Sequence, residues 1–217
     1  MKDHIHQVME QAHDAFQSYQ FCSGKDKKAF LYTIADEIEA LGDELLETAA
    51  RESNLPIARF IGERARTCNV FKMFGDLVEE GSWVEAVIDH SQPESLPLPK
   101  PEMRKMLIPL GPIVVFGASN FPLAYSTPGG DTASALAAGC PVVVKGHPLH
   151  PATSSLIAKA IDKAIDKHNL PKFTFQLLTE DSFESGKLLV QHPLTAGVGF
   201  TGSLHGGRAI FDYAQHR

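Results

Sequence analysis

A short polar segment, Phe200-Thr201-Gly202-Ser203, follows an apolar run and precedes residues with helical spacing. A glycine at such a junction lets a phosphate group approach the backbone. The helix N-terminus that follows offers free N–H groups and a partial positive charge. The same residues also suit a tight turn with a capping serine. The segment therefore predicts either a phosphate-binding turn or a simple N-cap at Ser203.

Two further polar side chains follow short apolar runs that are typical of strands. Asn120 comes after Ile113–Phe116, and Lys145 comes directly after Val142–Val144. An asparagine amide can donate a hydrogen bond to a developing oxyanion, or it can stabilise a turn. A lysine at the mouth of a parallel sheet can bind ribose hydroxyls or a phosphate, or it can lie on the surface. The pattern G-x-G-x-x-G is absent after the first run, which disfavours a standard Rossmann dinucleotide site.

Thiols and imidazoles form no reactive or metal-binding pattern in the sequence. Cys140 lies between a helix end and an apolar strand, and Cys68 lies on an apolar helical stripe, so both are expected in the core. Together with Cys22 they are too few and too scattered for a disulfide framework. His147 and His150 lack cysteine or carboxylate companions at metal spacing, so no zinc site is expected.

The elements that must position these groups begin with a helical region over residues 1–80. Apolar residues recur at helical spacing over residues 5–19 and 30–41. A third apolar stripe is predicted from Ile57, Phe60, Ile61, Ala65, Cys68, Phe71, Phe74 and Leu77. A solvated helix start explains the neighbouring lysines Lys25, Lys27 and Lys28.

The amino-acid composition becomes rich in proline over residues 81–112. Pro93, Pro97, Pro99, Pro101 and Pro109 exclude a helix, and alternation over residues 103–108 is compatible with a short strand. We expect an extended connector here, and a candidate region for contacts between subunits.

From residue 113 to residue 217, strand and helix patterns alternate. Strands are expected at residues 113–116, 142–144, 173–178 and 197–200. Helices are expected at residues 128–138, from Pro151, at residues 182–191 and after Ser203. This alternation predicts an α/β fold in which a Rossmann-like, doubly wound parallel sheet carries the helical region as an N-terminal layer. Such sheets bind ligands beyond the carboxyl ends of their strands.

Composition sets limits on the function of the 217 residues. The formal net charge is −6, and hydrophobic residues make up 43% of the chain, as in ordinary globular proteins. Basic residues form no clustered face, so nucleic acid is not an expected partner. The first residues lack an apolar signal core, and no stretch approaches the roughly 20 apolar residues that span a bilayer. We therefore expect a cytoplasmic protein with no membrane partner.

Three motifs, in order and at matching spacing, resemble the aldehyde dehydrogenase superfamily. They are Gly117-Ala118-Ser119-Asn120-Phe121-Pro122-Leu123, Gly139-Cys140-Pro141-Val142-Val143-Val144-Lys145 and Phe200-Thr201-Gly202-Ser203. The stretch Gly129–Cys140 is similar to the branch of 2,5-dioxovalerate (α-ketoglutaric semialdehyde) dehydrogenases and NADP-linked fatty aldehyde dehydrogenases. The resemblance covers nearly the whole chain.

The resemblance implies a role for each matching position. Asn120 would supply the amide of the oxyanion site, and Lys145 would hold the adenosine ribose of NAD or NADP. The positions implied to lie along the cofactor are Phe116, Gly117 and Ser119 in the groove, Gly202 and Ser203 facing the pyrophosphate, and Gly186 on the adenine side.

One departure from the family pattern bears on the cofactor. Many NAD-preferring relatives have a glutamate three residues after the lysine, where it binds both ribose hydroxyls. Pro148 stands at that place. With no carboxylate there to repel a 2′-phosphate, NADP is tolerable, and Lys145 could pair with it.

A larger departure is that the family's general-base glutamate and nucleophilic cysteine have no counterpart before Arg217. The resemblance therefore implies the cofactor-binding portion of an enzyme, truncated before strand five and the catalytic domain, and inactive alone. The intact parent would be a homo-oligomer that oxidises a small aldehyde to a carboxylate. Two alternatives stay open: an acyl-phosphate reductase of related fold, and a non-catalytic fragment that either binds nucleotide or is inert.

Overall fold

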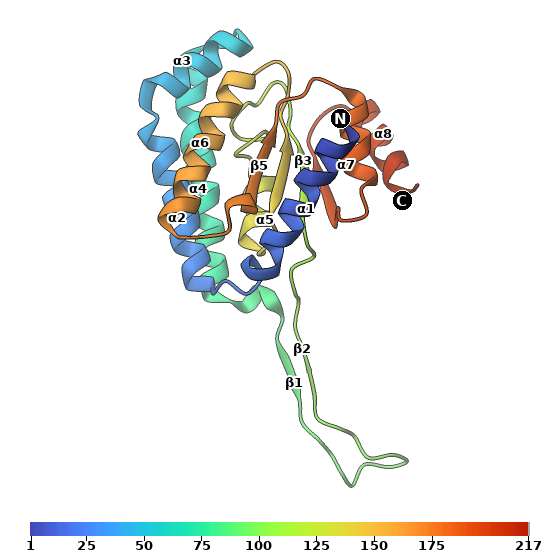
Figure 1. Ribbon diagram of the computed structural model, residues 1–217. Helices are drawn as coiled ribbons and strands as arrows, with labels where there is room; N and C mark the ends of the chain where they lie inside the picture. Colours follow the sequence, from blue (N-terminus) through green and yellow to red (C-terminus); the bar gives the residue numbers. More distant parts are fainter. Residues whose placement is uncertain (217) are drawn as a thin grey trace.

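The computed structural model describes residues 1–216, and its centre is a four-stranded parallel sheet (Figure 1). The strands are β3 (Ile113–Phe116), β4 (Val142–Lys145), β5 (Phe175–Leu178) and β6 (Gly197–Phe200). They lie in the order β5-β4-β3-β6, with Ile113 opposite both Val142 and Gly197. The predicted strands are confirmed, except that residues 172–174 form a 3-10 turn before β5. All four strands end at one edge of the sheet.

Helices cover both faces of the sheet. On one face lie α2 (Gly24–Ala40), α3 (Gly42–Ser53), α4 (Ile57–Glu80), α5 (Gly130–Ala137) and α6 (Pro151–Lys167). On the other lie α1 (Lys2–Tyr19), α7 (Phe183–Gln191) and α8 (Leu204–Ala214). Buried residues alternate between the faces: Val115 packs with α2 and α4, while Val114 packs with α1. The helices before residue 81 therefore share a core with the sheet, as expected for a doubly wound fold.

Two details of the helical layer differ from the sequence prediction. Helix α3 was not expected as a separate element; Gly42, with φ +56°, breaks the chain after α2, and Leu45, Leu46 and Ala49 are buried. The predicted stripe of α4 was partly wrong, because Ile57, Ile61, Ala65 and Leu77 are exposed. The buried stripe of α4 is instead Phe60, Glu63, Thr67, Cys68, Phe71, Gly75 and Val78.

The prediction that Lys27 belongs to a solvated helix start was also wrong. Lys27 is buried, and its ammonium lies 5.4 Å from the centre of the Trp83 ring. Trp83 belongs to a short 3-10 turn, Ser82–Val84, that packs against the end of α4. Burial lowers the pKa of Lys27, and the contact of its ammonium with the face of the Trp83 ring partly offsets the loss of water.

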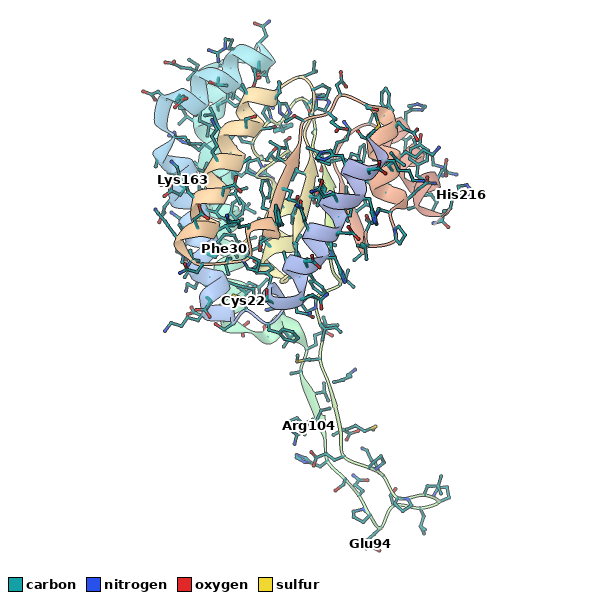
Figure 2. The ribbon with its side chains drawn as sticks, viewed as in Figure 1. Cys22, Phe30, Glu94, Arg104, Lys163 and His216 are labelled. Carbon is teal, nitrogen blue, oxygen red and sulfur yellow. The ribbon has the colours of Figure 1, made fainter. Side chains whose placement is uncertain are left out.

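The predicted connector forms a hairpin that extends away from the body (Figures 1 and 2). Its short strands β1 (Val87–Asp89) and β2 (Met103–Lys105) pair antiparallel. The strand predicted over residues 103–108 thus stops at residue 105. The exposed apolar side chains of the hairpin are Val87, Ile88, Leu96, Leu98, Met103, Met106, Leu107, Ile108 and Leu110. Within residues 1–216, no helix is long and apolar enough to cross a membrane.

Candidate functional site

A cavity of about 390 Å³ lies at the edge where the strands end. Five of the residues singled out in the sequence line it: Phe116, Gly117, Lys145, Pro148 and Gly186. They come from β3, β4, the start of the loop to α6, and α7. The other wall includes His205, Gly206, Ala209, Ile210 and Tyr213 of α8. Four chain segments that are distant in sequence therefore meet at one cavity.

Lys145 is the last residue of β4 and is only partly exposed. Burial lowers the pKa of its ammonium, while the carboxylates of Asp181 and Glu180 act in the opposite direction. Gly186 leaves the space beside Lys145 open. A Cβ there would stand 3.2 Å from the ring of Phe116 and 3.6 Å from Cδ of Lys145.

Asp181 was missed by the sequence analysis. The place three residues after Lys145 is indeed a proline, but Asp181 lines the same cavity from the loop before α7. The cavity therefore combines a cation, Lys145, with a carboxylate. His147 lines the same cavity, and the pKa of its imidazole is lowered. Burial is the main cause, His150 and Lys145 add to it, and Asp181 acts in the opposite direction.

The remaining four predicted residues line a second, more open hollow of about 600 Å³. They are Ser119, Asn120, Gly202 and Ser203. The loop after β3 passes from the first hollow to the second between Gly117 and Ala118. The structure thus divides the nine predicted residues between two hollows at the same edge of the sheet.

The turn after β6 has the features of an N-cap. The Ser203 hydroxyl oxygen accepts a hydrogen bond from the N–H of Gly206 at 3.1 Å. The packing of Phe200, the last residue of β6, favours glycine at position 202, because a Cβ there would lie 2.6 Å from the Phe200 ring. Gly206 and Gly207 also make room for that ring. The capping interpretation is confirmed, and the helix N-terminus still faces the hollow with its partial positive charge.

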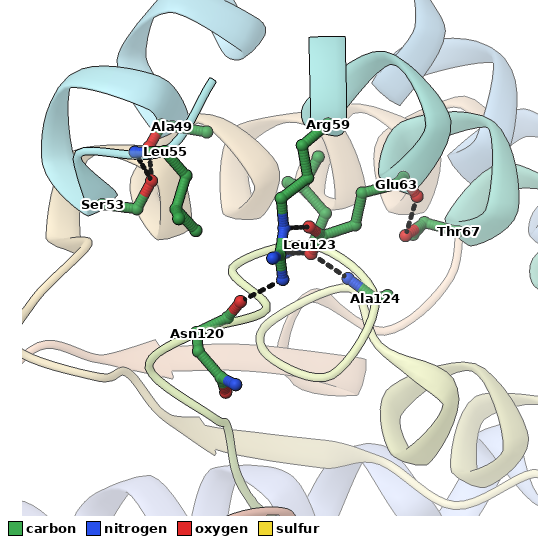
Figure 3. Close-up of polar contacts among 9 residues, drawn as sticks. All are labelled: Ala49, Ser53, Leu55, Arg59, Glu63, Thr67, Asn120, Leu123 and Ala124. Atoms are coloured by element: carbon green, nitrogen blue, oxygen red, sulfur yellow. Dashed lines mark hydrogen bonds and ion pairs between the residues drawn. The ribbon is translucent and has the colours of Figure 1, made fainter. Parts of the chain in front are cut away.

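Asn120 is exposed, and its backbone carbonyl accepts a hydrogen bond from Arg59 of α4 at 2.6 Å. Figure 3 shows its side-chain amide pointing away from Arg59. The amide is therefore not used by this contact and can donate to a ligand in the hollow.

The thiols lie outside both hollows. Cys68 and Cys140 are buried, as predicted, and burial raises the pKa of Cys68 to about 12. Burial also raises the pKa of Cys22, with Asp26 adding to the effect. The raised pKa values of Cys22 and Cys68 disfavour their thiolate forms at neutral pH, and Cys140 is buried away from both hollows.

Comparison with known proteins agrees with this geometry. The sequence model of the aldehyde dehydrogenase family matches residues 1–217. The chain belongs to the aldehyde dehydrogenase family. The α/β fold and the resemblance proposed from the three motifs are therefore confirmed.

Two relatives within the family share nearly half of the residues. The chain is 48% identical over 213 residues to alpha-ketoglutaric semialdehyde dehydrogenase 2 of Azospirillum brasilense, covering 98% of this chain and 41% of the relative. It is 46% identical over 215 residues to alpha-ketoglutaric semialdehyde dehydrogenase of Acinetobacter baylyi, covering 99% and 40%. The chain thus spans about two fifths of the length of these relatives.

Solved structures show the same fold. Betaine aldehyde dehydrogenase of Staphylococcus aureus in complex with NAD⁺ superposes with a TM-score of 0.85 at 22% identity, covering 100% of this chain and 41% of that one. Glyceraldehyde-3-phosphate dehydrogenase of Methanocaldococcus jannaschii complexed with NADP gives 0.81 at 22% identity, covering 98% and 44%. Both are named as dehydrogenases of aldehydes. The first structure contains NAD⁺, and the second contains NADP.

Proposed function

We propose that this chain forms the cofactor-binding portion of an NAD(P)-dependent aldehyde dehydrogenase. The observation that carries the proposal is the cavity at the carboxyl edge of the sheet, where Lys145, Gly186 and Phe116 meet. Open α/β sheets bind ligands at this edge. A cavity of about 390 Å³ with an apolar wall and a few charged groups, among them Lys145, Lys187 and Asp181, is within the usual range for small-molecule sites.

The residues fit NAD or NADP. The absent side chain of Gly186 leaves space beside Phe116 for a flat ring, and Lys145 can bind ribose hydroxyls or a phosphate. Gly117 lines the first hollow and Ser119 the second, and the N-terminus of α8 at Gly202 and Ser203 favours the negative charge of a pyrophosphate. A nicotinamide cofactor held there would supply the hydride acceptor for oxidation of the aldehyde. The amide N–H of Asn120 would donate a hydrogen bond to the aldehyde oxygen as negative charge develops there.

The aldehyde proposed for the whole protein is α-ketoglutaric semialdehyde, because the two relatives with 46–48% identity carry that name. The product is the corresponding carboxylate. Residues 1–217 alone are proposed to be inactive, since their three thiols are buried or have raised pKa values. The hairpin of residues 85–110 is proposed to contact a second subunit through its exposed apolar side chains.

The test is a steady-state assay of the full-length protein with α-ketoglutaric semialdehyde, following reduced cofactor at 340 nm. We expect turnover with NADP or NAD, and a fall in kcat of about 10²–10³-fold in Asn120→Ala, the size typical of one lost oxyanion donor. Full activity in Asn120→Ala would contradict the role of that amide. Turnover only with an acyl phosphate would favour the alternative reductase.

A further inference from the structure

Three charged residues of α4 contact the loop that carries Asn120. Arg59, Glu63 and Arg66 are spaced four and three residues apart, so they lie on one side of the helix. The loop runs over residues 120–125 and has no regular secondary structure. We call these three residues the α4 clamp.

Glu63 is the buried member of the clamp. Its Oε1 accepts hydrogen bonds from two consecutive backbone N–H groups, those of Leu123 at 2.8 Å and Ala124 at 2.9 Å (Figure 3). Its side chain is 4% exposed. A carboxylate is costly to bury unless it is paired and hydrogen-bonded, so this contact fixes the loop backbone strongly.

Arg59 connects Glu63 to Asn120. Its Nε lies 3.6 Å from Oε2 of Glu63, and its NH2 group donates to the carbonyl oxygen of Asn120 at 2.6 Å. The guanidinium carbon also lies 4.3 Å from the centre of the Phe121 ring. The residue that carries the exposed amide is therefore held by a charged hydrogen bond on its own backbone.

Arg66 holds the far end of the loop. Its guanidinium donates to the hydroxyl oxygen of Tyr125 and lies 4.9 Å from the centre of that ring. Tyr125 in turn accepts a backbone hydrogen bond from Ala118, at the start of the loop, at 2.8 Å. Both ends of the loop are thus tied to α4.

We propose that Arg59 and Glu63 are positioning residues that set the location of the Asn120 amide for aldehyde oxidation. The inference rests on the proposed function. Donors to a developing oxyanion must be held within about 0.5 Å of the productive position, and a displacement of about 1 Å can lower the rate about 100-fold. The loop has no helix or strand to hold Asn120, and the clamp supplies that rigidity.

A matched contact elsewhere in the chain provides the control. Glu52 also accepts hydrogen bonds from two consecutive backbone N–H groups, those of Ala152 and Thr153, both at 2.8 Å. It also accepts one from the Thr153 hydroxyl. This contact ties α3 to the start of α6 and touches no residue of the loop over 120–125. Glu52→Ala therefore removes an equivalent structural contact without reaching Asn120.

The test measures kcat and KM in the full-length enzyme with Arg59→Ala, Glu63→Ala, Glu63→Gln and Glu52→Ala. We expect Arg59→Ala and Glu63→Ala to lower kcat by about 10-fold to 100-fold, with the KM for the cofactor within about 2-fold of wild type. Glu63→Gln retains an amide oxygen that can accept from Leu123 and Ala124, so it should recover part of kcat. Glu52→Ala should keep kcat while losing thermal stability. If Glu63→Ala does not fold, Arg59→Ala and Glu63→Gln carry the comparison.

The most informative comparison measures kcat for each of these substitutions combined with Asn120→Ala in a double variant. If the clamp acts through Asn120, Arg59→Ala should lower kcat by less than about 3-fold in the Asn120→Ala background. Equal losses in both backgrounds would overturn the proposal, as would wild-type kcat in both Arg59→Ala and Glu63→Ala. If Asn120→Ala itself leaves kcat unchanged, the proposed role of Asn120 fails first, which distinguishes the two failures.

Discussion

Under the proposed function, the charges in the cavity would set the choice between NAD and NADP. Lys145 and Lys187 would attract a phosphate, while Asp181 would accept hydrogen bonds from ribose hydroxyls and repel a 2′-phosphate. From the sequence, Pro148 in place of a glutamate made NADP tolerable, with Lys145 available to pair with its 2′-phosphate. The structure places a carboxylate in the same cavity, so the choice depends on the balance between Lys145 and Asp181.

Asp181→Asn should therefore shift the preference towards NADP. Removing the carboxylate charge takes away repulsion of a 2′-phosphate, and we expect the ratio of affinities for NADP and NAD to rise about 10-fold, the effect of roughly 1.4 kcal/mol. Fluorescence titration of the full-length protein with both cofactors measures this ratio. Glu184→Gln, on the same segment but outside the cavity, serves as the control. An unchanged ratio in Asp181→Asn would show that this carboxylate does not face the 2′ position.

Gly117 leads to a prediction about stability. A Cβ at this position would lie 2.2 Å from Oγ and 2.6 Å from Cα of Ser126, so backbone must shift. Gly117→Ala should cost about 1–3 kcal/mol and weaken cofactor binding. Gly62→Ala, in α4, meets no atom within 4 Å in the described part of the chain and should stabilise by roughly 0.4–1 kcal/mol. Urea unfolding of both variants checks this, and equal stabilities would contradict the steric argument.

Among single residues, those that follow strands were predictable and those in long-range contacts were not. Lys145 and Ser203 follow apolar runs, and parallel topology brings such positions to one edge. Asp181 stands in an irregular loop, whose path depends on packing with α7. Glu63 did leave a signal, because a carboxylate occupies the buried stripe between Phe60 and Thr67. Nothing in the sequence indicated that this carboxylate meets Leu123 and Ala124, about 60 residues later.

At the scale of elements, α1 contacts the end of α7 through two histidines. Nδ1 of His6 lies 3.0 Å from Nε2 of His192, and Nδ1 of His192 accepts from the N–H of Leu194. Burial lowers the pKa of His192, and His6 adds to the effect, while Glu10 opposes it. Below about pH 6.5, His192 is therefore protonated more readily in the unfolded chain than in the folded chain.

The contact between α1 and α7 should accordingly weaken in mild acid. Its contribution is complete above pH 6.5 and is lost as the pH falls towards the depressed pKa of His192. His192→Asn keeps an acceptor for Leu194 but does not titrate there, so its thermal stability should fall less between pH 7.5 and 5.5. His90→Asn, on the exposed hairpin, should behave as wild type. An identical pH dependence in wild type and His192→Asn would contradict this account.

Elements with clear periodicity were predicted, whereas their junctions were not. The stripes of α1, α2 and α6 follow helical spacing, and all four strands appeared as apolar runs. Helix α3 was missed because Gly42 interrupts the pattern and leaves only three buried apolar residues. The misassigned stripe of α4 reflects its composition: apolar residues occur on two sides, and only packing against α2 selects one.

At the scale of the whole molecule, β6 and α8 form an open boundary of the sheet. Strand β6 pairs with β3 on one side and lies at the edge of the sheet formed within residues 1–216. Helix α8 has no buried residue in the same range, and Leu204 is 90% exposed. An open edge beside an apolar helix favours association with another chain.

Residues 1–217 produced alone should therefore fold and self-associate. We expect the apparent mass in light scattering to rise with concentration, alongside a helical circular dichroism spectrum. Leu204→Lys with Phe211→Lys should reduce association more than Leu96→Lys with Leu98→Lys if the β6–α8 boundary dominates. A monomer at all concentrations would show that this boundary is protected.

Calorimetric titration of the full-length protein with NADP tests most directly whether the cavity between β3, β4, α7 and α8 binds the nicotinamide cofactor, as we propose. Lys145→Ala should weaken binding at least about 10-fold, because a charge-assisted hydrogen bond is lost. Lys163→Ala removes an exposed lysine on α6, outside the cavity, and should bind as wild type does. NADP affinity that is unchanged in Lys145→Ala would contradict the claim.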